Sequence, residues 1–239
     1  MPMKIPFDRV AEIYDKTRGL PPEVMRKIVQ ILVKEMKGYK TVLDLGVGTG
    51  RFAKPLQENG FEVVGTDISE DMVKKAKKKG VKNLLLGDAC SLPFRDYSFD
   101  AALSVHVLHL IGDWQKALEE ICRVTKDELI SVTHKRPSPA SRAYEELAKK
   151  KGYDARNVGL SEHELQEKIK PTKSVSAATW VSSADQSLTY FKQRAYSRQW
   201  RVPEDIDKQI VNELLKRFTG QTYPLNIQIL KWNTNDLKQ

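Results

Sequence analysis

The sequence has few cysteines and no long apolar run, and each absence excludes a class of protein. Cys90 and Cys122 are the only cysteines, too few for a disulfide framework, and without clustered histidines they do not make a zinc site, so no metal is expected. No stretch approaches the roughly 20 apolar residues of a membrane span. The first eight residues lack the apolar core of a secretory signal. We therefore expect a cytoplasmic protein that does not enter a membrane.

Basic residues are in excess, with 40 Lys and Arg against 31 Asp and Glu. A net charge of +9 can indicate a nucleic-acid partner. Much of the lysine lies in residues 74–82, however, without the interleaved aromatic residues or glycine-arginine runs that favour nucleic-acid binding. The pattern favours a solvated lysine-rich surface, and nucleic acid stays the less favoured partner.

Strand and helix patterns alternate between residues 41 and 133. Amphipathic segments separate the apolar runs, which lie at 41–45, 61–66, 83–86, 99–105 and 128–133. The intervening helices are expected at about 50–59, 69–80 and 113–124. This alternation predicts a doubly wound, mainly parallel α/β sheet with right-handed crossovers.

The two ends of the chain have different patterns. Residues 1–38 carry apolar side chains at helical spacing and are expected to form a helical cap before a core at 39–134. Residues 135–239 are expected to complete the sheet. Within that part, helical patterns at 183–197 and 203–218 lie between two strand patterns, so residues of about 183–219 are expected to form a helical lid.

A glycine turn follows the first predicted strand, where residues 42–50 read VLDLGVGTG. Glycines at alternate positions let the backbone approach a ligand that side chains would block. Asp44, beside this turn, is a poor neighbour for a pyrophosphate but suits a ligand with an ammonium group.

Two further acidic positions follow the next two strands. Asp67 can accept two hydrogen bonds from a ribose diol. Asp88 can accept from the exocyclic amine of adenine, and the Ala89 amide can donate to a ring nitrogen. Because the carboxyl ends of parallel strands meet at one edge, these groups describe a ligand with an amine, a ribose and an adenine but no phosphate. S-adenosylmethionine fits this description, and a dinucleotide does not.

These residues carry a family resemblance. The chain resembles the class I S-adenosylmethionine-dependent methyltransferases, in particular the broad small-molecule (type 11-like) group with the VLDLGxGTG motif. Further matching segments lie at 64–69, 87–89, 92–94, 98–100 and 119–124. The resemblance is close over about residues 8–134 and holds in outline beyond. It implies a Rossmann-like, seven-stranded, mainly parallel sheet with the last strand antiparallel, plus a helical lid. Residues 125–128 depart from the Lys-Pro-Gly-Gly-like turn that is usual before the fifth strand, and we expect an altered surface turn there.

The resemblance also implies a cofactor role for each matched position. S-adenosylmethionine would be bound by Tyr14, Arg18, Asp44, Gly46, Gly48, Asp67, Ile68, Asp88, Ala89 and Ser104. Within this set, Asp44 and the backbone carbonyl of Ser104 would face the amine of the methionine part, and Arg18 would pair with its carboxylate.

Two histidines lie near the expected transfer site. His106 and His109 follow the fourth strand three residues apart, and either can act as a general base, although both can equally be packing residues. His134 is a further candidate. Methyl transfer from a sulfonium needs mainly alignment and desolvation, so whether a base is used stays open.

The sequence thus predicts an enzyme that transfers a methyl group in line to a small-molecule acceptor. An RNA or protein methyltransferase that uses the basic surface is the nearest alternative. A nicotinamide-dependent oxidoreductase, against which the three acidic positions argue, and a non-catalytic cofactor-binding protein are others. The acceptor, its reacting atom and the oligomeric state are left open.

Overall fold

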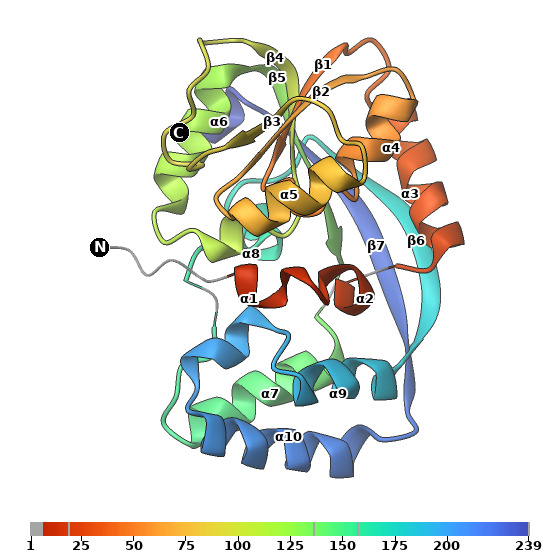
Figure 1. Ribbon diagram of the computed structural model, residues 1–239, viewed down its shortest axis with the longest axis vertical. Coiled ribbons are helices and arrows are strands. Elements are labelled where there is room, and N and C mark those ends of the chain that lie inside the picture. The colour runs from red at the N-terminus through yellow and green to blue at the C-terminus, as the bar shows by residue number, and fades with distance from the viewer. Residues whose placement is uncertain (1–6, 19, 136, 157, 239) are drawn as a thin grey trace. The chain divides into compact units, whose positions relative to one another are not determined.

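A computed structural model describes residues 7–18, 20–135, 137–156 and 158–238 (Figure 1). They form two compact units. The first comprises the described residues within 1–133, 158–178 and 227–239, and the second those within 134–157 and 179–226. Among these residues, no helix is both long and apolar enough to cross a bilayer.

One seven-stranded sheet has the strand order β3-β2-β1-β4-β5-β7-β6. The strands are β1 (Thr41–Leu45), β2 (Glu62–Asp67), β3 (Leu84–Leu86), β4 (Phe99–Ser104), β5 (Thr125–His134), β6 (Lys173–Ser183) and β7 (Thr222–Asn233). Parallel pairs join β1 to β2 and β4, β2 to β3, and β4 to β5. The strand order therefore reverses between β1 and β4, which is where open α/β sheets bind ligands.

Strand β7 runs antiparallel to β5, as the family resemblance implies. The Thr234 N–H donates to the Asp127 carbonyl at one end of the β5–β7 pair, and the Lys135 N–H donates to the Asn226 carbonyl at the other. Since the residue number rises along β5 as it falls along β7, the pair is antiparallel. The seven-stranded sheet with one antiparallel strand is thereby confirmed.

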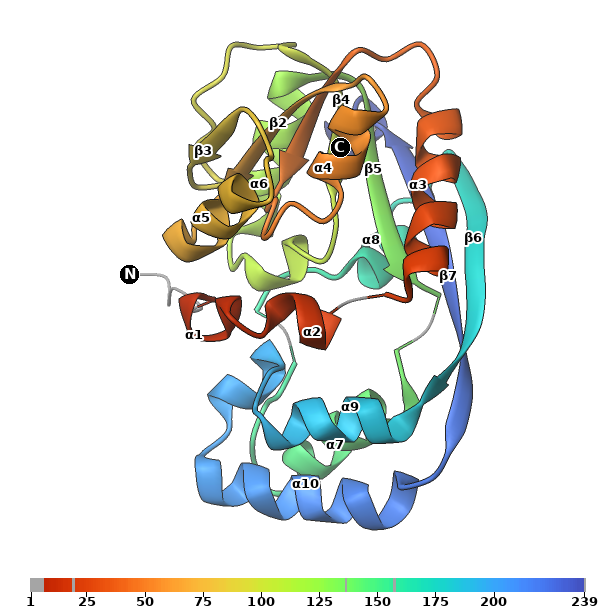
Figure 2. The ribbon, with the colours of Figure 1, turned by 45° about the vertical axis from the view of Figure 1, so that its right-hand side comes forward.

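Helices flank the strands of the first unit. They are α1 (Asp8–Ala11), α2 (Tyr14–Arg18), α3 (Pro22–Glu35), α4 (Ala53–Glu58), α5 (Glu70–Lys78), α6 (Trp114–Val124) and α8 (Glu162–Lys168), with short 3₁₀ turns at Leu108–Leu110 and Asp236–Lys238. Ser69 caps α5 by accepting from the Met72 N–H, and Asp113 caps α6 by accepting from the Lys116 N–H. Figure 2 shows α3 beside β6 and β7, where Lys173 forms an ion pair with Glu35.

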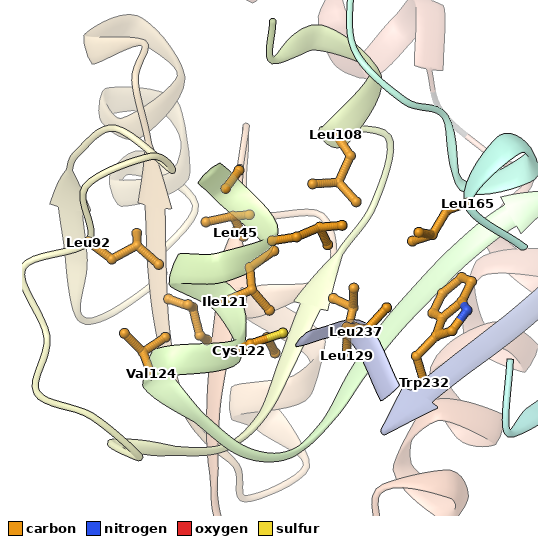
Figure 3. Close-up of a cluster of buried hydrophobic side chains, with 14 of the residues drawn as sticks. Leu45, Leu92, Leu108, Ile121, Cys122, Val124, Leu129, Leu165, Trp232 and Leu237 are labelled. Atoms are coloured by element: carbon orange, nitrogen blue, oxygen red, sulfur yellow. The ribbon is translucent and has the colours of Figure 1, made fainter. Parts of the chain in front are cut away.

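The main core lies between α6 and the strands beside it (Figure 3). Ile121, Cys122 and Leu129 are buried there, so Cys122 is a packing residue. Trp232 of β7 is also fully buried, and its indole N–H donates to the Ile169 carbonyl at 2.8 Å. That bond satisfies the single polar atom of the ring, so the whole side chain packs in the core.

Two expected boundaries in the first unit differ clearly from the structure. Helix α4 begins at Ala53 rather than near residue 50, because the left-handed Gly48 and Gly50 keep residues 48–52 in turns. The surface turn expected at 125–128 is wrong. Strand β5 begins at the buried Thr125, directly after α6, because this β-branched residue already pairs with Phe99 of β4.

The second unit is helical and has its own core. It contains α7 (Pro139–Lys150), α9 (Ala184–Lys192), a 3₁₀ segment at Ser197–Arg201 and α10 (Glu204–Phe218). The buried Asp207 accepts from the Tyr144 hydroxyl at 2.5 Å and from the Gln199 amide at 3.0 Å. The helix expected at 183–197 ends early because Arg194 takes a left-handed conformation. The lid role of these helices stays a prediction.

Candidate functional site

A cavity of about 440 Å³ opens at the carboxyl ends of β1, β2 and β4 and beside the segment after β3. This volume lies within the usual range for small-ligand sites. Eight of the predicted site residues line it: Tyr14, Gly46, Gly48, Asp67, Ile68, Asp88, Ala89 and His106. Segments that are far apart in the sequence therefore meet around one pocket.

The glycines of the turn are required for different reasons. Gly46 and Gly50 both have positive φ, and a Cβ on them would lie 2.3 Å from Val107 Cγ2 and 2.4 Å from Val81 Cγ2 respectively. Packing alone therefore demands glycine at both positions. A Cβ on Gly48 would meet nothing closer than 3.9 Å, so this residue leaves open space beside the pocket.

Asp67 joins the glycine turn to the start of α5. Its two carboxylate oxygens accept from the Gly48 N–H at 2.8 Å and the Ser69 N–H at 2.9 Å. These bonds fix the side chain at the pocket wall. A carboxylate offers about four acceptor positions, and this one lies at the wall of the pocket.

Asp44 lies beneath the turn rather than along the pocket. It is 3% exposed, is not among the lining residues, and accepts from the backbone N–H of Ala53. Burial raises its pKa to about 7, and the nearby charge of Asp67 adds to the increase. Its predicted role toward the ligand amine stays a prediction, and the contact in the structure is with the backbone at the start of α4.

The segments after β2 and β3 provide an apolar surface beside a carboxylate. Ile68 is 51% exposed although it is apolar, and it lines the pocket. Asp88 accepts from the Cys90 N–H at 2.9 Å through one oxygen. An exposed aliphatic face next to an acceptor suits a flat heterocycle with an exocyclic amine.

The N-terminal helices are tied to the turn and to α5. The Asp15 carboxylate accepts from the Thr49 hydroxyl at 2.6 Å and pairs with Lys79 at 2.6 Å, while Glu12 pairs with Lys75 at 2.8 Å. Part of the lysine run expected as a solvated surface therefore anchors these helices, which bring Tyr14 to the pocket. The predicted Arg18 lies outside the residues whose side chains the structure describes.

The segment after β4 places the remaining candidates. Ser104 is fully buried and does not line the pocket. His106 lines the pocket and has a left-handed backbone conformation, with φ +59°. His109 does not line the pocket, although its ring centre lies 6.4 Å from that of His106. His134 belongs to the second unit, where its ring lies 6.0 Å from that of Trp180. Only His106 among the three histidines borders the cavity.

Several lining residues were not predicted from the sequence. Val107, Leu110 and Ile111 give the wall after β4 an apolar surface, and an apolar run after a strand end is a weak signal because core residues share it. Glu162, which accepts from the His106 N–H at 3.0 Å, is 56 residues distant, and nothing in the sequence pattern connects the two. Among the described residues, no group of three or more His, Cys, Asp or Glu could hold a metal.

Comparisons with known proteins relate the chain to methyltransferases. Residues 43–130 match the family described as a methyltransferase domain. An uncharacterized protein of Methanocaldococcus jannaschii is 34% identical over 166 residues, which is 69% of this chain and 78% of that protein. The demethylmenaquinone methyltransferase of Paenarthrobacter aurescens is 40% identical over 124 residues, or 50% of this chain and 49% of the relative. The chain thus spans about half the length of this and a second demethylmenaquinone methyltransferase that it matches.

Solved structures share the fold. The YcgJ protein of Bacillus subtilis has a TM-score of 0.58 at 24% identity, with 86% of this chain and 96% of that chain covered. The seven-stranded sheet with its antiparallel last strand agrees with the fold of these methyltransferases. The chain belongs to the class I S-adenosylmethionine-dependent methyltransferases.

Proposed function

We propose that this enzyme transfers the methyl group of S-adenosylmethionine to a small-molecule acceptor by in-line displacement. The observation that carries the proposal is one cavity lined both by Asp67, Ile68 and Asp88 and by the apolar wall after β4. Relatives named as a demethylmenaquinone methyltransferase and a malonyl-[acyl-carrier protein] O-methyltransferase also support a small acceptor group.

The sheet order supports a proposed place in this cavity for each end of the donor. We propose that Asp88 and the Ala89 amide bind the adenine, against the exposed face of Ile68, and that Asp67 accepts from the ribose hydroxyls. Gly48 leaves room for the methionine part above β1. Because β4 lies on the other side of β1 from β2, we assign the reacting end of the donor to the wall after β4.

The bound donor supplies an electrophilic methyl group on a positively charged sulfur. The chain then has to align the acceptor and exclude water, because a nucleophile attacking in line needs little further assistance. Val107, Leu110 and Ile111 provide an apolar surface for this purpose. His106 lies where it can take a proton from a hydroxyl or amine acceptor, and we assign any general-base role to it before His109.

Isothermal titration with S-adenosylhomocysteine tests the donor site, with NADH as the comparison ligand. We expect the wild-type protein to bind S-adenosylhomocysteine and not NADH. Asp67→Ala should weaken binding more than tenfold, because a bidentate contact to the ribose is lost together with two bonds that shape the turn. Asp71→Ala removes an exposed acid of α5 that does not line the pocket, and it is the matched control. Unchanged affinity in Asp67→Ala would refute the assignment.

A further inference from the structure

The pocket wall after β4 is built from irregular backbone. Residues 105–107 and 110–113 line the cavity, yet the segment contains only a bend, the 3₁₀ turn at Leu108–Leu110 and a turn at 112–113. A segment without a regular helix or strand ladder needs other contacts to hold one conformation. Those contacts come from residues 159–162, which precede and begin α8.

The first contact is a carboxylate held by consecutive backbone N–H groups. Oε1 of Glu162 accepts from the His106 N–H at 3.0 Å, and the Val107 N–H is directed at the same carboxylate. His106 has φ +59°, and Val107 has φ −117° and ψ −51°. A left-handed residue followed by a right-handed one turns successive N–H groups toward one point, which is an anion-binding nest.

The nest explains the unusual conformation of His106. Residues with a Cβ avoid the left-handed region unless the surroundings compensate. Here the compensation comes from Glu162, which is 2% exposed and accepts from backbone N–H groups. Burial raises the pKa of Glu162 to about 7, so these bonds are charge-assisted, and thus of the stronger kind, from neutral pH upward.

The second contact is a close approach of backbone to backbone. The Gly159 N–H donates to the His109 carbonyl at 3.0 Å. A Cβ on Gly159 would lie 2.1 Å from the Leu108 carbonyl oxygen and 2.2 Å from that of Ile111. Glycine is therefore required at this position. The backbone at Gly159 lies close to the wall at both ends of the 3₁₀ turn.

We propose that Glu162 and Gly159 are positioning residues that fix the wall after β4, and His106 on it, at the methyl-transfer end of the pocket. This inference rests on the proposed function, because the wall matters for transfer only if the donor binds in this cavity. Neither residue lines the pocket, so both act through the backbone that does.

The test compares Glu162→Gln with Glu164→Gln. Glutamine at 162 keeps one carbonyl acceptor but turns an amide N–H₂ toward an N–H donor of the nest, so one buried donor loses its partner. We expect S-adenosylhomocysteine to bind about tenfold more weakly, and the His106 and Val107 amide resonances to move upfield in ¹⁵N–¹H spectra. Glu164 is exposed on the same helix and serves the Ser161 cap, which glutamine also supports, so its variant should change neither.

The outcomes separate the two proposals. A wild-type protein that does not bind S-adenosylhomocysteine overturns the proposed function. Wild-type binding with unchanged affinity in Glu162→Gln, or weakened affinity with unmoved His106 and Val107 resonances, overturns the positioning role.

If Glu162→Gln does not fold, the wild-type protein decides the question. NMR scalar coupling across the hydrogen bond, from the His106 amide nitrogen to the Glu162 carboxylate carbon, supports the nest, and its absence overturns it. Gly159→Ala displaces the same wall from its other contact and should lower the S-adenosylhomocysteine affinity in the same direction.

Discussion

Replacement of Asp44 by asparagine should remove a pH dependence of folding stability. The Asp44 carboxyl is buried, and its pKa rises from an ordinary 3.8 to about 7 because of that burial and the Asp67 charge. The folded protein therefore keeps this proton up to about pH 7, whereas the unfolded chain loses it near pH 4. Since the folded state binds more protons in this interval, the free energy of unfolding falls as the pH rises from about 4 to 7.

The magnitude follows from the gap between the two pKa values. One pKa unit corresponds to about 1.4 kcal/mol, so the full interval amounts to about 4 kcal/mol, and the part above pH 5 to about 3 kcal/mol. Asparagine keeps a carbonyl acceptor for the Ala53 N–H and has no proton to lose. The stability of Asp44→Asn relative to wild type should therefore rise by about 3 kcal/mol between pH 5 and pH 8. Any cost of the new amide group is a constant offset.

Urea unfolding at four pH values from 5 to 8, followed by tryptophan fluorescence and circular dichroism, measures this difference. Other titrating groups such as Glu162 contribute to both proteins and cancel in the comparison. A difference that stays constant over this pH range would refute the reasoning. The same series with saturating S-adenosylhomocysteine tests the predicted role of Asp44 toward the ligand amine, because an ammonium group nearby would lower the Asp44 pKa and reduce the slope.

Three further variants test other parts of the site. Gly46→Ala should destabilise the fold by about 2 kcal/mol or more, because of the positive φ at this position and the contact of the new Cβ with Val107. In thermal unfolding, the additional substitution Val107→Ala should recover part of that loss. Equal stability of Gly46→Ala and wild type would contradict the packing argument. His109→Ala should bind S-adenosylhomocysteine with wild-type affinity in titration, since this side chain does not line the pocket, and a loss of binding would place it in the donor site. Asp15→Ala should weaken S-adenosylhomocysteine severalfold because the bond to Thr49 is lost, whereas an unchanged Kd would show that the N-terminal helices do not shape the pocket.

The fold and most of the pocket residues that follow β1, β2 and β3 were predictable because local sequence patterns encode them. Apolar runs ending at Asp67 and before Asp88 mark strand ends, and parallel strands bring their carboxyl ends together. The position of a residue directly after a strand is therefore enough to place it at the ligand-binding edge of the sheet. The early end of α9 is harder, because a left-handed Arg194 has no signature in the sequence.

The rest of the site depends on contacts between distant segments. Glu162 lies in a polar stretch that reads as loop or short helix, and only the folded chain brings it to the His106 N–H. The sequence places Asp44 near the ligand because it adjoins the glycines, yet the pleat turns its side chain toward the Ala53 N–H under the turn. When both faces of a sheet are covered, the direction in which a side chain points at the end of a strand depends on tertiary packing.

The place of β7 in the sheet has a consequence for biosynthesis. This strand is among the last segments of the sequence given, but it lies between β5 and β6 rather than at an edge. During translation, β5 and β6 therefore leave the ribosome with a strand-wide gap between them, and each presents an open edge until residues 222–233 arrive. Nascent chains stalled before residue 222 should be the species most in need of chaperones, and the helical insertion that separates β6 from β7 sets how long that exposure lasts.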